Sequence, residues 1–392
     1  MNKSKTITGE DFNQNRTIAI FSNSFWNLKN FRREIIERLY ELNYNLILIY
    51  PYDDDVHKID FSYCKHVVLH ELKVLSKSIW SDYKFYKEIS RVFQKNQIDL
   101  VLSFTIKPNI YGSMVAKAYG IPCIATVTGL GKEIIKGNLF SKLLNTIYKN
   151  SVRSDQFVVF HNEEDLITFD PQRLHSNYIV INGSGVNTKV FSKSENVENK
   201  SLHKFIFLFS GRLIKSKGIM EFLEAAAKVK SENTELQFWI IGKHSEEELD
   251  VYNLLMDHQE RGIITYCGFI DQPKEILSQV QVLVLPSYRE GKSKSILEAM
   301  SMQIPVICSD VAGCHDLIKN NWNGLLINAK DSSALANAMR SMALLNESER
   351  VQMGLRSREE VVKNYDVNII SNKYLELIDS IFYNIKSNNF KN

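Results

Sequence analysis

The sequence predicts an α/β protein built from two Rossmann-like, doubly wound domains, and three observations support this prediction. Short apolar segments alternate with amphipathic ones, which is typical of a parallel sheet covered by helices on both faces. The alternation stops at one polar stretch, residues 192–203, and then starts again. The length of 392 residues exceeds what one hydrophobic core usually spans, so two domains are expected.

In the first half of the chain, short apolar runs predict five buried strands. They are expected at residues 16–22, 46–50, 100–104, 123–127 and 156–160. A helix is expected over residues 30–42, because apolar side chains recur there at helical spacing. We expect this half, residues 1–195, to form an N-terminal, acceptor-binding domain.

The second half repeats the pattern. Strands are expected at residues 205–210, 237–241, 263–267, 282–286 and 305–309. Helices are expected at residues 218–230, 246–259, 295–301 and 367–385. We expect a donor-binding C-terminal domain over residues 196–365 and a final helix within 366–392 that packs back toward the N-terminal domain. Because ligands of such sheets bind at the carboxyl ends of strands, two domains facing across a cleft would hold a donor and an acceptor.

Composition narrows the class of protein. A net charge of +3 is small for this length and disfavours a general nucleic-acid binder. Five scattered cysteines, without a CxxC motif or a Cys/His cluster, disfavour a zinc site or disulfide framework and suit a reducing cytoplasm. Residues 1–15 do not resemble a signal peptide, and no stretch reaches the roughly 18 apolar residues of a membrane span. We therefore expect a cytoplasmic protein whose membrane contact is peripheral.

The segment whose residues point most clearly to a functional site is 286–310, PSYREGKSKSILEAMSMQIPVICSD. Glu290 follows an expected strand, and Glu298 lies about one turn into the next helix. Carboxylates can accept hydrogen bonds from sugar hydroxyls. Loop residues 291–294 place backbone N–H groups at the start of the helix, which favours an anion. Two glutamates alone are also common on a solvated helix.

A second segment, residues 210–218 (SGRLIKSKG), supplies cations at another strand end. Arg212 offers a planar fork of donors and Lys217 a point charge, and both suit a diphosphate. Two strand ends of one domain thus provide two cations and two carboxylates. This combination matches the two ends of a nucleotide-sugar.

These motifs resemble those of the retaining GT-B glycosyltransferases of family 4, over most of the chain and best over residues 205–326. The family signature of Glu, seven residues and Glu, then Ala-Met and Pro-Val-Ile, is similar to Glu290, Glu298, Ala299, Met300 and residues 305–307. The family's Gly-Arg-Leu and Lys-Gly elements are similar to residues 211–213 and 217–218.

The resemblance implies roles for these residues. Arg212 and Lys217 would hold the diphosphate, while Glu290 would contact hydroxyls of the transferred sugar and Glu298 those of the ribose. The turn after Gly268 would offer backbone groups to the base. Further donor-binding positions implied are Gly211, Gly291, Lys292, Ser293, Phe269, Ile270, Thr128 and Gly129. UDP is favoured over GDP or ADP by the resemblance alone.

The N-terminal half is similar to the bacterial capsule and lipid-linked-oligosaccharide members of the family. The similar blocks are residues 30–32, 107–109, 128–131 and 183–186. Many members carry a histidine at the transferred sugar where Thr128 stands, so no imidazole base is expected there. Many also carry proline where Ser293 stands. This resemblance implies an undecaprenyl-diphosphate-linked acceptor and the transfer of a hexose or N-acetylhexosamine.

The implied chemistry needs no protein nucleophile. Retaining enzymes of this fold react at the front face through an oxocarbenium-like state, and the leaving diphosphate takes the acceptor's proton. Cations and a helix N-terminus stabilise the charge growing on that diphosphate. No cofactor and no metal is expected, because two side-chain cations take the metal's place. The acidic run at Asp53–Asp55 is expected to be a solvated turn rather than a metal site.

Residues 131–153 (GKEIIKGNLFSKLLNTIYKNSVR) interleave basic and apolar side chains with a single acid, Glu133. The pattern suits a helix on an anionic bilayer surface, at the inner face of the plasma membrane. It also suits a helix that is buried on one face and has solvated lysines on the other.

Three other functions fit parts of the sequence. A UDP-sugar 2-epimerase-like enzyme would bind the donor without needing an acceptor. A non-catalytic nucleotide-binding protein would bind it and turn nothing over. A nicotinamide-dependent enzyme fits less well, because the segment after the first strand, SNSFWNLKN, lacks a GxGxxG motif.

Overall fold

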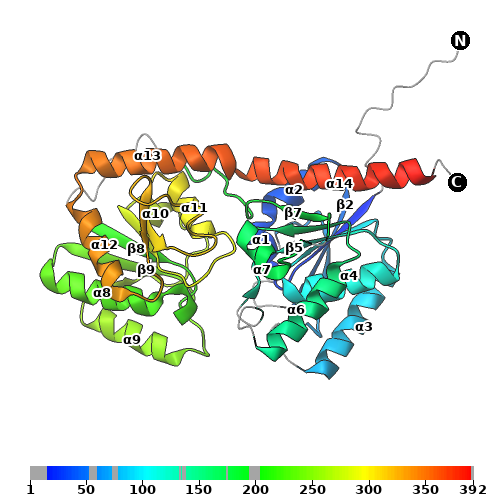
Figure 1. Ribbon diagram of the computed structural model, residues 1–392, viewed down its shortest axis with the longest axis horizontal. Helices are drawn as coiled ribbons and strands as arrows, with labels where there is room; N and C mark the ends of the chain where they lie inside the picture. Colours follow the sequence, from blue (N-terminus) through cyan, green and yellow to red (C-terminus); the bar gives the residue numbers. More distant parts are fainter. Residues whose placement is uncertain are drawn as a thin grey trace, which may run out of the picture. The chain divides into compact units, whose positions relative to one another are not determined.

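The chain divides into two compact units in the computed structural model, which describes residues 16–52, 60–72, 78–131, 134, 138–173, 175–193 and 204–389. Unit 1 comprises residues 1–184 and 370–392, and unit 2 comprises residues 185–369. Each unit contains one parallel sheet with helices packed against it (Figure 1). The predicted α/β class with two doubly wound domains is confirmed.

The seven-stranded sheet of unit 1 has the order β3-β2-β1-β4-β5-β6-β7. Its strands are β1 (Thr17–Phe21), β2 (Asn45–Pro51), β3 (Lys65–Leu69), β4 (Leu100–Phe104), β5 (Cys123–Val127), β6 (Phe157–Phe160) and β7 (Tyr178–Val180). Its helices are α1 (Phe25–Phe31), α2 (Arg33–Glu41), α3 (Ile79–Lys95), α4 (Ile106–Ala118), α6 (Leu139–Val152), α7 (Glu163–Phe169) and α14 (Val367–Asn389). The order reverses between β1 and β4, whose carboxyl ends are therefore neighbours.

Two layers of helices cover the sheet of unit 1. On one face, α1, α2 and α14 pack over apolar side chains such as Ile18, Leu48 and Leu102. On the other face, α3, α4, α6 and α7 enclose two further apolar clusters. The last helix is thus part of the core of unit 1, to which it contributes Tyr374 and Ile378.

The helix expected over residues 30–42 is two helices that meet at Arg32. The backbone of Arg32 has φ −128° and ψ 2°, which is not helical, and it both ends α1 and precedes α2. The first helix starts earlier than expected because Ser24 caps it: the Ser24 Oγ accepts a hydrogen bond from the Asn27 N–H at 3.1 Å. The prediction was therefore wrong about where the helix begins and about its continuity.

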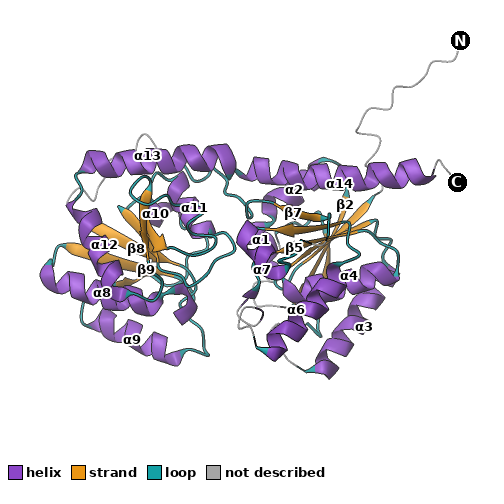
Figure 2. Ribbon diagram, in the orientation of Figure 1, coloured by secondary structure: helices purple, strands orange, loops and turns teal. Residues whose placement is uncertain are grey.

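Helices also flank the sheet of unit 2 (Figure 2). This sheet has six strands, in the order β10-β9-β8-β11-β12-β13. Its strands are β8 (Phe205–Ser210), β9 (Leu236–Ile241), β10 (Thr265–Tyr266), β11 (Val282–Leu285), β12 (Val306–Ser309) and β13 (Gly324–Ile327). Its helices are η3 (Lys215–Lys217), α8 (Ile219–Glu232), α9 (Leu249–Glu260), α10 (Lys274–Leu277), α11 (Lys294–Ser301), α12 (Ser332–Leu344) and α13 (Glu347–Asn364). The order reverses between β8 and β11.

One continuous apolar cluster forms the core of unit 2. It includes side chains from β8 and β11, such as Phe209 and Leu283, which are both fully buried. The core therefore fixes the two strands whose carboxyl ends meet at the reversal of strand order.

Candidate active site

The loops that carry the predicted site residues leave the sheet of unit 2 side by side. Phe209 of β8 pairs with Val284 of β11 in the parallel ladder, so these strands end together. The loop after β8 holds Arg212 and Lys217, and the loop after β11 holds Glu290. This position, where the strand order reverses, is where doubly wound sheets bind ligands.

Glycine at position 218 allows the two loops to touch. Gly218 has φ +73°, and a Cβ atom added there would lie 2.0 Å from the carbonyl oxygen of Pro286. Nearby, the Tyr288 N–H donates a hydrogen bond of 2.9 Å to the carbonyl oxygen of Ser216. The Lys217 side chain is therefore presented directly beside the loop that bears Glu290.

Lys217 and Glu290 form an ion pair. The Lys217 Nζ lies 2.5 Å from the Glu290 Oε1, and their side chains are 20% and 9% exposed. The Ser287 Oγ donates a second hydrogen bond, of 2.7 Å, to the same oxygen. Two donors on one oxygen hold the carboxylate in a single orientation, with its other oxygen left for further hydrogen bonds.

Arg212 differs from Lys217 in its surroundings. Its side chain is exposed and, within the described residues, has neither an ion pair nor a hydrogen bond. The backbone next to Arg212 is held in place by a hydrogen bond of 3.0 Å, which the Leu213 N–H donates to the Lys243 carbonyl oxygen. Before it, Gly211 approaches Gly242 so closely that a Cβ on Gly242 would lie 1.8 Å from the Gly211 carbonyl oxygen. An anchored loop thus carries a cation that can bind a phosphate.

Glu298 is the second buried carboxyl group of the site. It lies in α11, whose first turn is capped by Ser293, and it is 8% exposed. The Lys294 Nζ is 3.9 Å from its Oε1. Burial raises the pKa of the Glu298 carboxyl group from its ordinary value to about 7, although the charge of Lys294 acts in the opposite direction.

The loop between these glutamates is held by its own contacts. The Lys292 Nζ lies 2.5 Å from an oxygen of Asp316, and the Lys292 side chain is only 3% exposed. Gly313 passes beneath the loop, and a Cβ there would lie 2.6 Å from the carbonyl oxygens of Glu290 and Gly291. The ammonium group of Lys292 therefore stabilises the conformation of the loop through Asp316. The backbone N–H groups around Gly291 and Ser293 are the donors in this loop that suit an anionic ligand.

The other predicted donor-binding residues are placed as follows. Phe269 is 51% exposed, Ile270 packs on the core of unit 2, and both follow Gly268, which has φ +74°. Thr128 and Gly129 belong to unit 1, directly after β5.

Sequence reasoning missed Ser287, although it lies inside the segment that drew attention. A serine in a loop carries no signal of its own, and its role follows from the bond to Glu290. It also missed the neighbours beneath the site, Cys308 and Cys314. A hydrogen bond that the Cys314 thiol donates to Cys308, together with burial, raises the pKa of that thiol.

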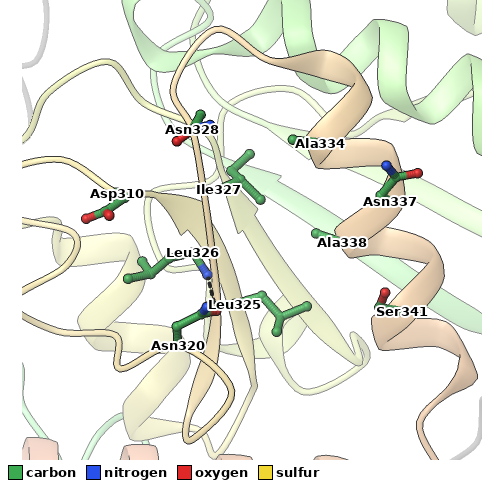
Figure 3. Close-up of a pocket in the computed structure, with 10 residues that line it drawn as sticks. All are labelled: Asp310, Asn320, Leu325, Leu326, Ile327, Asn328, Ala334, Asn337, Ala338 and Ser341. Atoms are coloured by element: carbon green, nitrogen blue, oxygen red, sulfur yellow. Dashed lines mark hydrogen bonds between the residues drawn. The ribbon is translucent and has the colours of Figure 1, made fainter.

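Figure 3 shows a different hollow of unit 2, between β13 and α12. Its volume is about 490 Å³. Its lining includes Asn320, whose side chain accepts a hydrogen bond of 3.0 Å from the Leu326 N–H. None of the predicted site residues lines it. The hollow is therefore separate from the candidate site.

Metal ligands are not clustered in the part of the chain that the structure describes: no three His, Cys, Asp or Glu side chains there could share an ion. The acidic run Asp53–Asp55 lies outside the described residues.

Two family models match the chain, and together they cover most of it. Residues 18–162 match "Glycosyl transferase 4-like", and residues 204–344 match "Glycosyl transferases group 1". The first match lies within unit 1, and the second, within unit 2, contains Arg212, Lys217, Glu290 and Glu298.

Relatives with named activities align over most of their length. A Campylobacter jejuni N,N'-diacetylbacillosaminyl-diphospho-undecaprenol alpha-1,3-N-acetylgalactosaminyltransferase is 28% identical over 94% of this chain and 100% of its own. An Escherichia coli UDP-Gal:alpha-D-GlcNAc-diphosphoundecaprenol alpha-1,3-galactosyltransferase is 26% identical over 77% of this chain and 81% of its own.

Solved structures share the fold. The crystal structure of Anabaena HepE in complex with UDP and glucose has a TM-score of 0.77 and 15% identity, covering 92% of this chain and 99% of that one. Sucrose-phosphate synthase from Thermosynechococcus elongatus has a TM-score of 0.78 and 20% identity, over 94% and 99%. The chain therefore belongs to the group 1, family 4-like glycosyltransferases with the GT-B fold, and it is a hexosyltransferase.

Proposed function

We propose that this glycosyltransferase moves a hexose or N-acetylhexosamine, with retention, from a UDP-sugar to an undecaprenyl-diphosphate-linked saccharide. The donor part of this proposal rests on one observation: the Lys217–Glu290 ion pair lies at the strand-order reversal of unit 2, in the same loops as the exposed Arg212, which has no partner among the described residues. An exposed cation for the diphosphate and an oriented carboxylate for sugar hydroxyls are the groups that a nucleotide-sugar needs.

In this proposal each group has one task. Arg212 and Lys217 stabilise the charge that grows on the leaving diphosphate. Glu290 binds hydroxyls of the transferred sugar with the oxygen that Lys217 and Ser287 leave available. Glu298 accepts hydrogen bonds from the ribose hydroxyls. The reaction needs no metal ion, so we expect the rate of transfer to be unchanged in excess EDTA.

The acceptor is proposed from the relatives. The Campylobacter and Escherichia enzymes are named for saccharides on diphospho-undecaprenol, and this chain covers 100% and 81% of their lengths. The product would be a lengthened lipid-linked saccharide for a cell-surface polysaccharide.

A lipid-linked acceptor calls for a membrane contact, and α6 provides a suitable surface. Leu139, Leu143 and Ile147 are 86%, 59% and 44% exposed and follow one another at intervals of four residues. They therefore form one apolar stripe, which lies beside the exposed Lys142 and Arg153. Such a stripe suits the anionic inner face of the plasma membrane. Among the described helices, none combines the length and the hydropathy needed to cross a bilayer.

The function is tested with calorimetry and a transfer assay. UDP, GDP, ADP and NAD are titrated into the wild type and into Glu298→Ala, and UDP-sugars are then incubated with and without a diphosphate-linked acceptor. We expect UDP to bind most tightly, the variant to bind it more weakly, and product to form only with acceptor. Donor conversion without acceptor would indicate an epimerase, and UDP binding without any turnover a binding protein.

A further inference from the structure

Unit 1 has a strand-order reversal of its own, between β1 and β4. Phe21 lies opposite Ser103 in the parallel ladder, so the segments that follow β1 and β4 leave the sheet side by side. In doubly wound sheets this crevice is a place where ligands bind. None of the residues predicted to bind the donor comes from these two strand ends.

Polar atoms without partners gather around this crevice. Within the described residues, five buried atoms there have no hydrogen-bond partner: Ser22 Oγ, Asn23 Oδ1, Asn27 Oδ1, Arg32 Nε and Thr105 Oγ1. Folded proteins pair nearly all such atoms, because an unpaired one lowers stability. A concentration of them at one place indicates groups that are reserved for a ligand.

The backbone is also strained at this place. Thr105, the residue after β4, has φ 77° and ψ 165°. A positive φ is unfavourable for a β-branched residue, and strain of this kind is found mainly at binding and catalytic sites. The strained residue is one of the five with an unpaired atom.

Arg32 is a buried cation that has no anionic partner in the part of the chain that the structure describes. Its side chain is 2% exposed, and its Cζ lies 4.0 Å from the centre of the Phe104 ring, at the end of β4. No carboxylate of the described residues pairs with it. The ionisable group that acts on Arg32 is Tyr374, whose hydroxyl group shares a hydrogen bond of 3.2 Å with the Thr126 Oγ1. Burial lowers the pKa of the Arg32 guanidinium to about 10.

The chemistry of these groups points to one kind of ligand. Two carboxamide oxygens accept hydrogen bonds, two hydroxyl groups donate and accept, and a guanidinium group binds an anion. A sugar bears hydroxyl groups that do both, and a diphosphate supplies the anion.

We propose that the crevice between β1 and β4 binds the sugar–diphosphate part of the acceptor, with Arg32 on the diphosphate and Asn27 on the sugar. This inference rests on the proposed function, since it assigns that acceptor to particular residues. It makes Arg32 a residue that selects acceptors by their diphosphate.

A structural role and a binding role for Arg32 predict different effects of its replacement on Tm. A buried cation without a counter-ion costs stability, so its replacement by a neutral residue of similar length should not lower Tm. A structural role predicts a lower Tm, because packing against Phe104 is lost. We expect Arg32→Met to have the wild-type Tm or a higher one, with weakened ligand binding.

The test measures binding to the full chain by calorimetry, without donor. The first ligand is N-acetylglucosamine linked through a diphosphate to a short alkyl chain, and the second is the alkyl glycoside of the same sugar without the diphosphate. The variants are Arg32→Met and Asn27→Ala. The matched control is Arg33→Met, which makes the same substitution at the neighbouring arginine. UDP binding and Tm are recorded for every variant.

We expect Arg32→Met to weaken the first ligand by about tenfold to a hundredfold and the second hardly at all, as for a lost charge-assisted bond. Asn27→Ala should weaken both ligands, and Arg33→Met neither. The proposal is overturned if both site variants bind the first ligand as the wild type does, as when ordered water satisfies these atoms. It is also overturned if Arg33→Met weakens it equally, or if a wild type that binds UDP binds neither ligand. A wild type that does not bind UDP contradicts the proposed donor instead.

Discussion

The Lys217 ammonium group lies 2.5 Å from the Glu290 carboxylate, whereas Arg212, five residues earlier in the same loop, has no partner among the described residues. The two cations proposed for the diphosphate thus differ in whether they also contribute to the stability of the fold. In the proposed site, Lys217 would support both the native structure and the ligand, and Arg212 the ligand alone.

Replacement of these two cations should therefore separate activity from stability. We expect Arg212→Ala to lower kcat by about 10²–10³, as for the loss of one oxyanion-hole donor, and to leave Tm unchanged. Lys217→Ala should lower kcat similarly and also lower Tm, because it leaves Glu290 buried without its counter-ion. Steady-state rates and thermal melts of both variants provide the measurement. A normal rate for Arg212→Ala would remove it from the site.

The pKa of about 7 for Glu298 predicts that donor binding depends on pH. Ribose hydroxyls donate hydrogen bonds, so they favour the ionised carboxylate, and UDP affinity should rise as the pH rises through 7. Calorimetry at pH 6 and pH 8 measures this, and Glu298→Gln should abolish the difference. If the variant keeps the wild-type pH dependence, another group causes it.

Stability should change with pH in the opposite direction. The pKa of Glu298 is higher in the folded state than in the unfolded chain, where it is near 4.5. The folded protein therefore binds more protons between these values, and its stability falls as the pH rises through about 7. We expect Glu298→Gln to have a higher Tm than the wild type at pH 8 and a similar Tm near pH 5. Thermal melts across this range would show the reverse order if the carboxylate were stabilising.

Gly218 offers a test of how closely the two site loops must approach. An alanine Cβ there would meet the Pro286 carbonyl at 2.0 Å, so Gly218→Ala should lower both Tm and activity. Gly262 is the matched control, because it has φ +68° but no atom within 4 Å of an added Cβ. Gly262→Ala should cost only the backbone strain, about 1–2 kcal/mol. Equal losses in the two variants would show that strain alone matters.

The apolar stripe on α6 predicts binding to lipid. Leu143→Glu places a charge in its middle, and we expect it to reduce co-sedimentation with anionic liposomes at low salt while UDP binding stays normal. Leu344→Glu is the control, since Leu344 is 85% exposed in unit 2. The membrane proposal fails if the wild type does not sediment, or if both variants sediment as the wild type does.

Much of the sheet structure could be predicted from the sequence, and the reason lies in burial. The strands β4, β5 and β8 have the predicted bounds, because each is a short, predominantly apolar run that is almost fully buried. The edge strands β3, β7 and β13 were missed, since each is largely half-buried and so lacks a clear apolar run. Helix α4 was missed because it buries residues on several sides, including Asn109 and Ser113, and so lacks an amphipathic period.

The candidate site was predictable only in part. Arg212, Lys217, Glu290 and Glu298 belong to local motifs that a family resemblance can identify. The bond from Ser287 to Glu290 and the isolation of Arg32 have no sequence signal, because they depend on which segments the fold brings together. Neither the capping of α1 by Ser24 nor the break at Arg32 could be read from the apolar period alone.

The placement of α14 in unit 1 has a consequence for how the protein is made. The core of unit 1 needs Tyr374, Ile378 and Ile381, which leave the ribosome after all of unit 2. At about 5–20 residues per second, the 185 residues of unit 2 take roughly 10–40 s to synthesise. During that interval the nascent first half exposes the apolar face that α14 later covers, while unit 2 can fold without interruption. Truncation before α14 should therefore yield an aggregating chain, even though every residue of the proposed donor site is still present.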